Sequence, residues 1–127
     1  SKALDVKTRE RIAITVAQAN GCDYCLSAHT YLGLNLAKID NTEIALNRRG
    51  ASSDPMANAA VAFARKITEN HGRAAEADLQ AVRAAGYTDA QIIEIIAVVA
   101  ENIYTNMVNI VAGTEIDFPV VLASEAA

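Results

Sequence analysis

The chain lacks the features that mark several large classes of protein. It has two cysteines, two histidines and two prolines among 127 residues, and no stretch has the apolar–polar alternation of a β-strand. Its eleven lysines and arginines are scattered and outnumbered by fifteen acidic residues, for a net charge of −4, so we expect no nucleic-acid partner. No repeat or low-complexity tract appears. What remains is an all-α protein that forms a single domain over residues 1–127.

The expected helices are delimited by ordinary start and stop residues. Asp5 is a good N-cap, Gly21 a typical helix end, Pro55 suits a first helical position, and Thr88-x-x-Gln91 is a capping box. The helices should cover residues 6–20, a segment that begins near Cys22 or Asp23, and residues 40–49, 55–71, 75–85 and 89–112. The sequence therefore predicts a bundle of about six helices.

The last of these helices is apolar on nearly every side, with eleven aliphatic or methionine residues. We expect no membrane span, because Glu94, Glu101 and several asparagines interrupt it, and charges in mid-membrane cost several kcal/mol. A soluble helix of this kind must be buried on all sides. Five short neighbours do not easily cover it, so part of its surface should contact a second copy of the chain in a homo-oligomer. Glu101 and Asn102 should line a pocket, pair at the subunit contact or meet solvent.

Most of the chemical information lies in a Glu-x11-Cys-x2-Cys-x3-His array formed by Glu10, Cys22, Cys25 and His29. Two cysteines at this spacing can cycle between dithiol and disulfide. If a helix begins at Cys22, Cys25 and His29 lie one turn apart on one face. The unpaired N–H groups of the first turn would favour a thiolate at Cys22 and lower its thiol pKa from about 8.5. Glu10 and His29 are then placed to move protons.

Other interpretations of the array were weighed. Zinc could take four ligands from it, but structural zinc sites usually use two ligand pairs, and the chain has no second one. Covalent haem attachment needs a histidine directly after the second cysteine, where Leu26 stands. A thioredoxin-type site would follow a β-strand, and none is expected here. Two buried, unreactive cysteines beside a surface histidine remain the simplest alternative.

The array and its surroundings resemble the alkyl hydroperoxidase D and carboxymuconolactone decarboxylase superfamily, whose redox-active members carry the same Glu-x11-Cys-x2-Cys-x3-His pattern. The stretches at 4–10, 19–22, 86–90 and 104–106 are also similar to that family. The similarity extends from about residue 4 to 118. It implies an alkyl hydroperoxidase D-like helical bundle.

The resemblance also implies an activity and a role for each residue. It predicts a thiol peroxidase or disulfide oxidoreductase that works through a Cys22–Cys25 disulfide, with Cys25 as the peroxide-attacking cysteine and Cys22 as its resolving partner. Glu10 and His29 match the proton relay. Alkyl hydroperoxidase D proper has a histidine just before the second cysteine, where this chain has Tyr24, so Tyr24 is a possible auxiliary residue.

This chemistry sets the expected partners. The substrate is a hydroperoxide, and a dithiol reductant or redox partner protein must reopen the disulfide. No cofactor and no metal are needed. A cycling cysteine pair and the lack of a signal-peptide pattern favour the cytoplasm, and the resemblance suggests a trimer or hexamer. The alternatives are a non-redox module that binds a small ligand or zinc, and a carboxymuconolactone decarboxylase-type lyase, although true decarboxylases lack this cysteine pair.

Overall fold

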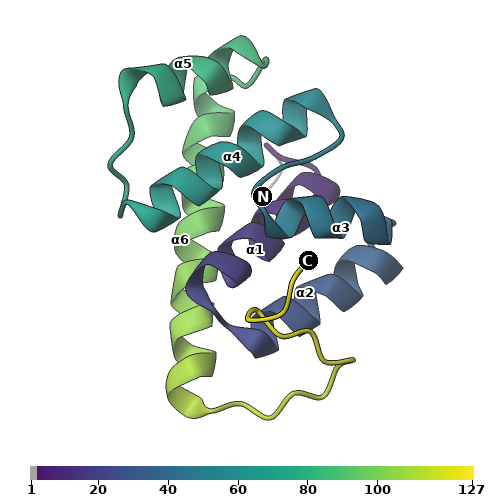
Figure 1. Ribbon diagram of the computed structural model, residues 1–127. Coiled ribbons are helices and arrows are strands. Elements are labelled where there is room, and N and C mark those ends of the chain that lie inside the picture. The colour runs from purple at the N-terminus through teal and green to yellow at the C-terminus, as the bar shows by residue number, and fades with distance from the viewer. Residues whose placement is uncertain (1–2) are drawn as a thin grey trace.

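Six helices make up the computed structural model, which describes residues 3–127 and has no strand in that range (Figure 1). The all-α prediction is confirmed, and the expected helix boundaries agree to within two residues. The helices are α1 (Val6–Asn20), α2 (Asp23–Asn35), α3 (Asn41–Arg48), α4 (Pro55–Glu69), α5 (Glu76–Ala84) and α6 (Asp89–Ala112).

The helix ends use the residues that the sequence indicated. The Asp5 carboxylate accepts a hydrogen bond from the Thr8 amide at 2.7 Å, and the Thr88–Gln91 capping box closes in both directions. Gly21 ends α1 in the left-handed region, at φ +68°, where a residue with a Cβ is strained. The chain can therefore turn sharply from α1 into α2, which brings the start of α2 next to α1.

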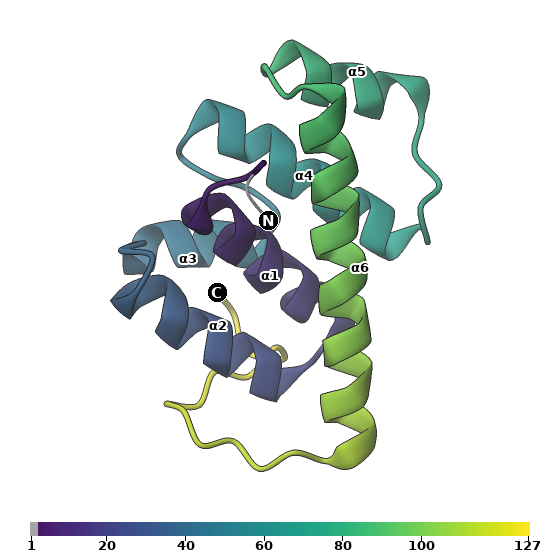
Figure 2. The same ribbon diagram turned by 180° about the vertical axis from the view of Figure 1, so that it is seen from behind.

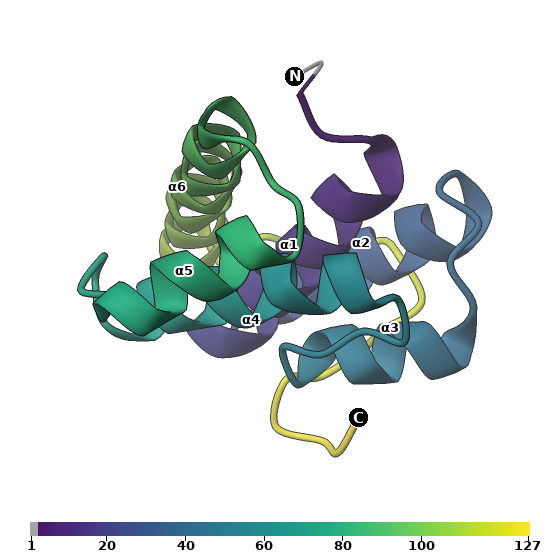
Figure 3. The ribbon, with the colours of Figure 1, turned by 90° about the horizontal axis from the view of Figure 1, so that it is seen from above.

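The central helix is α1, which packs against α2, α3, α4 and α6 (Figures 1 and 3). Every residue from Ile12 to Ala17 is buried. Ile12 and Val16 belong to one apolar cluster with α4 and α6, whereas Ile14 and Ala17 belong to a second cluster with α2 and α3. Small side chains among these residues, such as Ala13 and Ala17, allow four neighbours to approach one helix.

The other five helices do not cover the last helix on all sides, as expected, and its contact with a second copy stays a prediction. One side of α6 packs on α1, α2 and α4, and the other side is exposed along its length. By length and composition alone, α6 is the one helix among the described residues that could cross a membrane. Its exposed large apolar residues are Ile93, Ile96, Tyr104, Met107, Val108, Ile110 and Val111.

A buried carboxylate joins α3 to α1 and to the loop before α4. Glu43, whose side chain is 7% exposed, accepts from Arg11 at 2.9 Å and from Asn47 at 3.1 Å. The hydroxyls of Ser52 and Ser53 and the Ser53 amide also donate to it. Burial alone would raise the pKa of Glu43, but these hydrogen bonds outweigh it and lower the pKa to about 2. We call this cluster the Glu43 junction.

The segment after α6 returns along α2 and ends near α3 (Figures 1 and 2). The Ser27 hydroxyl accepts from the Val121 amide at 2.8 Å, and the Asp23 carboxylate accepts from the Ala123 amide at 2.8 Å. Gln18 donates to the Ala123 carbonyl. Because these bonds reach α1 and α2, the segment fixes the outer side of α2.

Candidate active site

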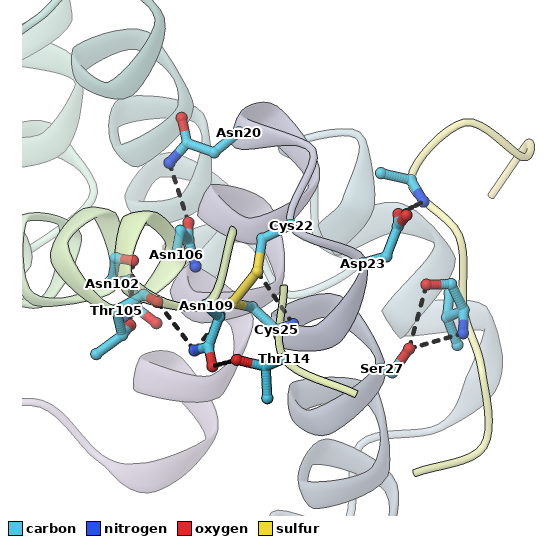
Figure 4. Close-up of a disulfide and its surroundings, with 12 residues drawn as sticks. Asn20, Cys22, Asp23, Cys25, Ser27, Asn102, Thr105, Asn106, Asn109 and Thr114 are labelled. Carbon is cyan, nitrogen blue, oxygen red and sulfur yellow. Dashed lines mark hydrogen bonds between the residues drawn. A yellow bond between two sulfur atoms is a disulfide. The ribbon is translucent and has the colours of Figure 1, made fainter. Parts of the chain in front are cut away.

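Cys22 and Cys25 form a disulfide at the start of α2, with an S–S distance of 2.11 Å (Figure 4). Cys22 is the N-cap of the helix, and its Sγ accepts a hydrogen bond from the Cys25 amide at 3.2 Å. The two residues are 1% and 4% exposed. The sequence placed Cys22 at or just before the first turn of this helix, and that placement is confirmed.

Glu10 and His29 meet across the contact between α1 and α2. His29 Nδ1 lies 2.8 Å from Glu10 Oε2, and both side chains are partly exposed. Among the described residues, no hydrogen-bond partner engages His29 Nε2. The structure therefore brings all four residues of the array together, although they span 19 positions of the chain between Glu10 and His29.

A pocket of about 320 Å³ opens beside this pair, between α1, α2 and α6. Cys25 and His29 line it, and Cys22 does not. The two cysteines thus differ in access: the Cys25 side chain borders a space that can hold a small substrate, whereas Cys22 is enclosed. The pocket lining consists of Arg9, Glu10, Ala13, Tyr24, Cys25, Ala28, His29, Glu94, Val98, Glu101, Asn102, Thr105 and Asn109.

Polar residues of α6 form the pocket wall that was predicted least well from the sequence. Glu101 and Asn102 line the pocket, one of the three placements expected for them. Asn109 was not singled out, yet its Nδ2 lies 3.8 Å from Cys25 Sγ. The available signal was the recurrence of polar residues in an apolar helix at positions 94, 101, 102, 105 and 109, which repeats at the spacing of one helix face.

Arg9 was also missed. It lines the pocket next to Glu10, and its Nε is buried with no hydrogen-bond partner in the described chain. Burying a guanidinium nitrogen without a hydrogen-bond partner costs free energy. Arg9 therefore adds a positive charge to a wall that also carries Glu94 and Glu101.

Tyr24 borders the pocket from the first turn of α2. Its ring packs edge-on against Phe118 of the returning segment, with 6.0 Å between ring centroids. Within residues 3–127, nothing hydrogen-bonds to its hydroxyl. The structure thus places Tyr24 at the site without joining it to the Glu10–His29 pair.

The described residues of this site do not offer a ready set of metal ligands. No cluster of three or more histidine, cysteine, aspartate or glutamate side chains suited to a metal ion occurs among the described residues. The chemistry that the site can support is that of a dithiol–disulfide pair, one sulfur of which lies beside a hydrogen-bonded carboxylate–imidazole pair.

Comparison with known proteins gave a family match and several similar structures. The model of the carboxymuconolactone decarboxylase family matches residues 1–70. A comparison with curated proteins gave no match.

Three solved structures share the fold. An uncharacterized peroxidase-related protein from Silicibacter sp. TM1040 is 26% identical, with a TM-score of 0.78 over 100% of this chain and 66% of that one. The debrominase Bmp8, as the apo protein, is 20% identical with a TM-score of 0.79. A Bmp8 variant in complex with 2,3,4-tribromopyrrole is 19% identical, also with a TM-score of 0.79. This chain is covered to 91% in both comparisons, and it spans 63% of the Bmp8 chains.

Proposed function

This chain belongs to the carboxymuconolactone decarboxylase family, and we propose that it is a thiol-dependent peroxidase. In this proposal it reduces a hydroperoxide through Cys25 and is restored by a dithiol reductant in the cytoplasm. The likeness to a peroxidase-related protein supports the proposal.

The observation that carries the proposal is the position of one sulfur. Cys25 lines a pocket together with the Glu10–His29 pair, and its disulfide partner Cys22 is enclosed next to it. Peroxide reduction needs a thiolate, a proton donor and a resolving thiol within reach. Each of the three has a side chain in this site.

The reaction proceeds in three balanced steps. The Cys25 thiolate attacks the hydroperoxide, the O–O bond breaks, and the departing alkoxide takes a proton from His29, leaving a sulfenic acid on Cys25. The Cys22 thiol then displaces the hydroxyl of that sulfenic acid as water, which forms the disulfide. A dithiol donates two electrons and two protons by exchange and reopens the disulfide. Glu10 holds the His29 ring by the contact between Glu10 Oε2 and His29 Nδ1.

Steady-state peroxide consumption by the reduced protein, with dithiothreitol as reductant, tests the proposal. We expect Cys25→Ser to abolish turnover. With peroxide added after dithiothreitol has been removed, Cys22→Ser, the matched variant of the enclosed sulfur, should permit a single attack and leave a sulfenic acid on Cys25 that reacts with dimedone. Two results would contradict the proposal: no consumption by the fully reduced wild type, or stoichiometric zinc that protects both thiols from alkylation, which is the result expected of a non-redox module.

We also propose that the protein is a homo-oligomer in which a second copy covers the exposed side of α6. Seven large apolar side chains on one face of one helix are more than a monomer usually leaves in contact with water. Light scattering at micromolar concentration should give a multiple of 13.4 kDa. A stable 13.4 kDa particle would contradict this part of the proposal.

A further inference from the structure

The Cys25 sulfur has a hydrogen-bond donor from the far end of the chain. Asn109 lies in the last turn of α6, and its Nδ2 approaches Cys25 Sγ at 3.8 Å across 84 positions of sequence (Figure 4). This contact lies at the pocket wall, where both residues are found. A sulfur in a disulfide is a weak acceptor, whereas a thiolate is a strong one.

Two further hydrogen bonds fix the orientation of the Asn109 amide. Its Nδ2 donates to the Thr105 carbonyl at 2.9 Å, and its Oδ1 accepts from the Thr114 hydroxyl at 2.8 Å. Rotating the amide by half a turn would place Oδ1 against the Thr105 carbonyl oxygen, acceptor against acceptor, and lose that bond. The side that meets Cys25 is therefore the donor side.

The two sulfurs accept hydrogen bonds from different kinds of donor. Cys22 Sγ accepts from a backbone amide, which any residue other than proline would supply at position 25. Within the described chain, the hydrogen bond to Cys25 Sγ comes from a side chain, Asn109. The helix start therefore stabilises negative charge on Cys22, and the charge on the pocket-facing sulfur depends on residue 109.

We propose that Asn109 stabilises the thiolate form of Cys25 by hydrogen bonding, lowers the pKa of that thiol and shifts the Cys22–Cys25 pair toward its reduced form. The inference deepens the proposed function, since it concerns the state in which Cys25 attacks. Thr114 is the positioning residue that holds the Asn109 donor toward the sulfur. The end of α6 and the start of the returning segment thus belong to the site.

The pKa of a single thiol gives the direct test. In the Cys22→Ser background, the rate of alkylation by iodoacetamide is measured against pH. Asn109→Leu has a similar branched shape and no donor, and we expect it to raise the pKa of the Cys25 thiol by about one unit, the low end for a hydrogen bond to a charged group because the contact is long. Asn35→Leu is the matched control, since Asn35 makes the same bond to the Tyr31 carbonyl four residues earlier, at 2.9 Å, on the exposed end of α2.

The intact pair gives a second readout. When the protein exchanges with dithiothreitol, two electrons and two protons pass to the cysteines and the reagent closes to its cyclic disulfide. Removing the donor destabilises the thiolate and leaves the disulfide nearly unchanged. Asn109→Leu should therefore shift this equilibrium about tenfold toward the protein disulfide at a pH above the thiol pKa, where one pKa unit corresponds to a factor of ten.

Thr114→Val keeps the Asn109 side chain and tests whether the orientation of its amide matters. It also replaces Asn109→Leu as the test if that variant does not fold. It should raise the thiol pKa by a smaller amount in the same direction. Equal pKa values in Asn109→Leu and Asn35→Leu, or in Thr114→Val and its parent where only that variant folds, would overturn the inference. Peroxide consumption is measured separately: a shifted pKa in a protein that consumes no peroxide supports the role of Asn109 and rejects the peroxidase.

Discussion

Glu10 and Glu43 are two partly or fully buried carboxylates beside α1, and their surroundings differ in one respect. Glu43 accepts hydrogen bonds from five donor groups, contributed by Arg11, Asn47, Ser52 and Ser53. Glu10 has a single partner among the described residues, His29, and lines a pocket. Arg11 and Glu10 are neighbours in sequence and contact different helices, α3 and α2 respectively, so α1 contributes to both regions.

The difference separates a structural charge from the one that we propose takes part in the reaction. A carboxylate whose pKa is lowered to about 2 keeps its charge throughout the neutral range and cannot carry protons there. Its value lies in joining three segments of chain. Glu10 has one partner, the imidazole of His29, which borders the pocket. Saturation of hydrogen bonds therefore indicates which of two similar acids belongs to the chemistry.

The largest expected effect is on the rate of peroxide consumption, and it tests the role given to Glu10. Glu10→Gln should slow peroxide consumption about 10²- to 10⁴-fold, the usual contribution of acid–base assistance, because the glutamine amide cannot exchange a proton with His29. The free energy of unfolding should change by less than about 1 kcal/mol, since the pair is partly exposed. Glu69→Gln is the control, an exposed glutamate that pairs only with Arg65. A rate within twofold of that control would remove Glu10 from the mechanism.

The second prediction concerns the Glu43 junction. Glu43→Gln should lower the free energy of unfolding by about 3 kcal/mol, because it leaves Arg11 buried without its partner and turns an amide toward other donors. Urea unfolding measures the loss. Peroxide consumption per folded molecule should stay at the wild-type rate, in contrast to Glu10→Gln. A loss below about 1 kcal/mol would show that the junction is not a structural anchor.

Acid should weaken the Glu43 junction in a defined window. The pKa of Glu43 is lowered from 4.5 to about 2 on folding, so its contribution is complete above pH 4.5 and is lost as the pH falls toward 2. Linkage gives a loss of about 2 kcal/mol between pH 7 and pH 3. We expect the difference in unfolding free energy between wild type and Glu43→Gln to shrink by that amount over this range. A constant difference would contradict the lowered pKa.

Local sequence signals were enough to predict the helices. Asp5, Gly21, Pro55 and the Thr88–Gln91 box each act within four residues of their own position, so their geometry can be read from the chain itself. The array of Glu10, the two cysteines and His29 could be recognised equally well, since it spans two consecutive helices joined by Gly21 and Cys22.

The contacts that were missed join distant segments. Asn109 reaches Cys25 across 84 positions, and Arg11 reaches Glu43 across 32. No spacing rule connects such residues, because the packing of whole helices decides which side chains meet. For the same reason the sequence did not identify α1 as the central helix: α6 has more apolar residues, but α1 is the helix that packs against four neighbours.

The smallest predicted effect concerns Tyr24, which borders the pocket but is not joined to the Glu10–His29 pair. Tyr24→Phe keeps the ring against Phe118 and removes a hydroxyl that has no partner in the described chain. Peroxide consumption should change by less than about threefold and stability by less than about 0.5 kcal/mol. Tyr31→Phe is the matched control, since Tyr31 also packs on Phe118, with 5.6 Å between ring centroids, and does not line the pocket.

Together, the two tyrosine variants test whether the Tyr24 hydroxyl takes part in proton transfer in addition to Glu10. If Tyr24→Phe slowed turnover tenfold or more and Tyr31→Phe did not, the Tyr24 hydroxyl would take the place of the relay histidine during the reaction. The pocket would then contain a second proton donor that is unpaired at rest. If both variants keep the wild-type rate, proton movement is confined to Glu10 and His29, and the contribution of Tyr24 is its ring, which closes the pocket against the returning segment.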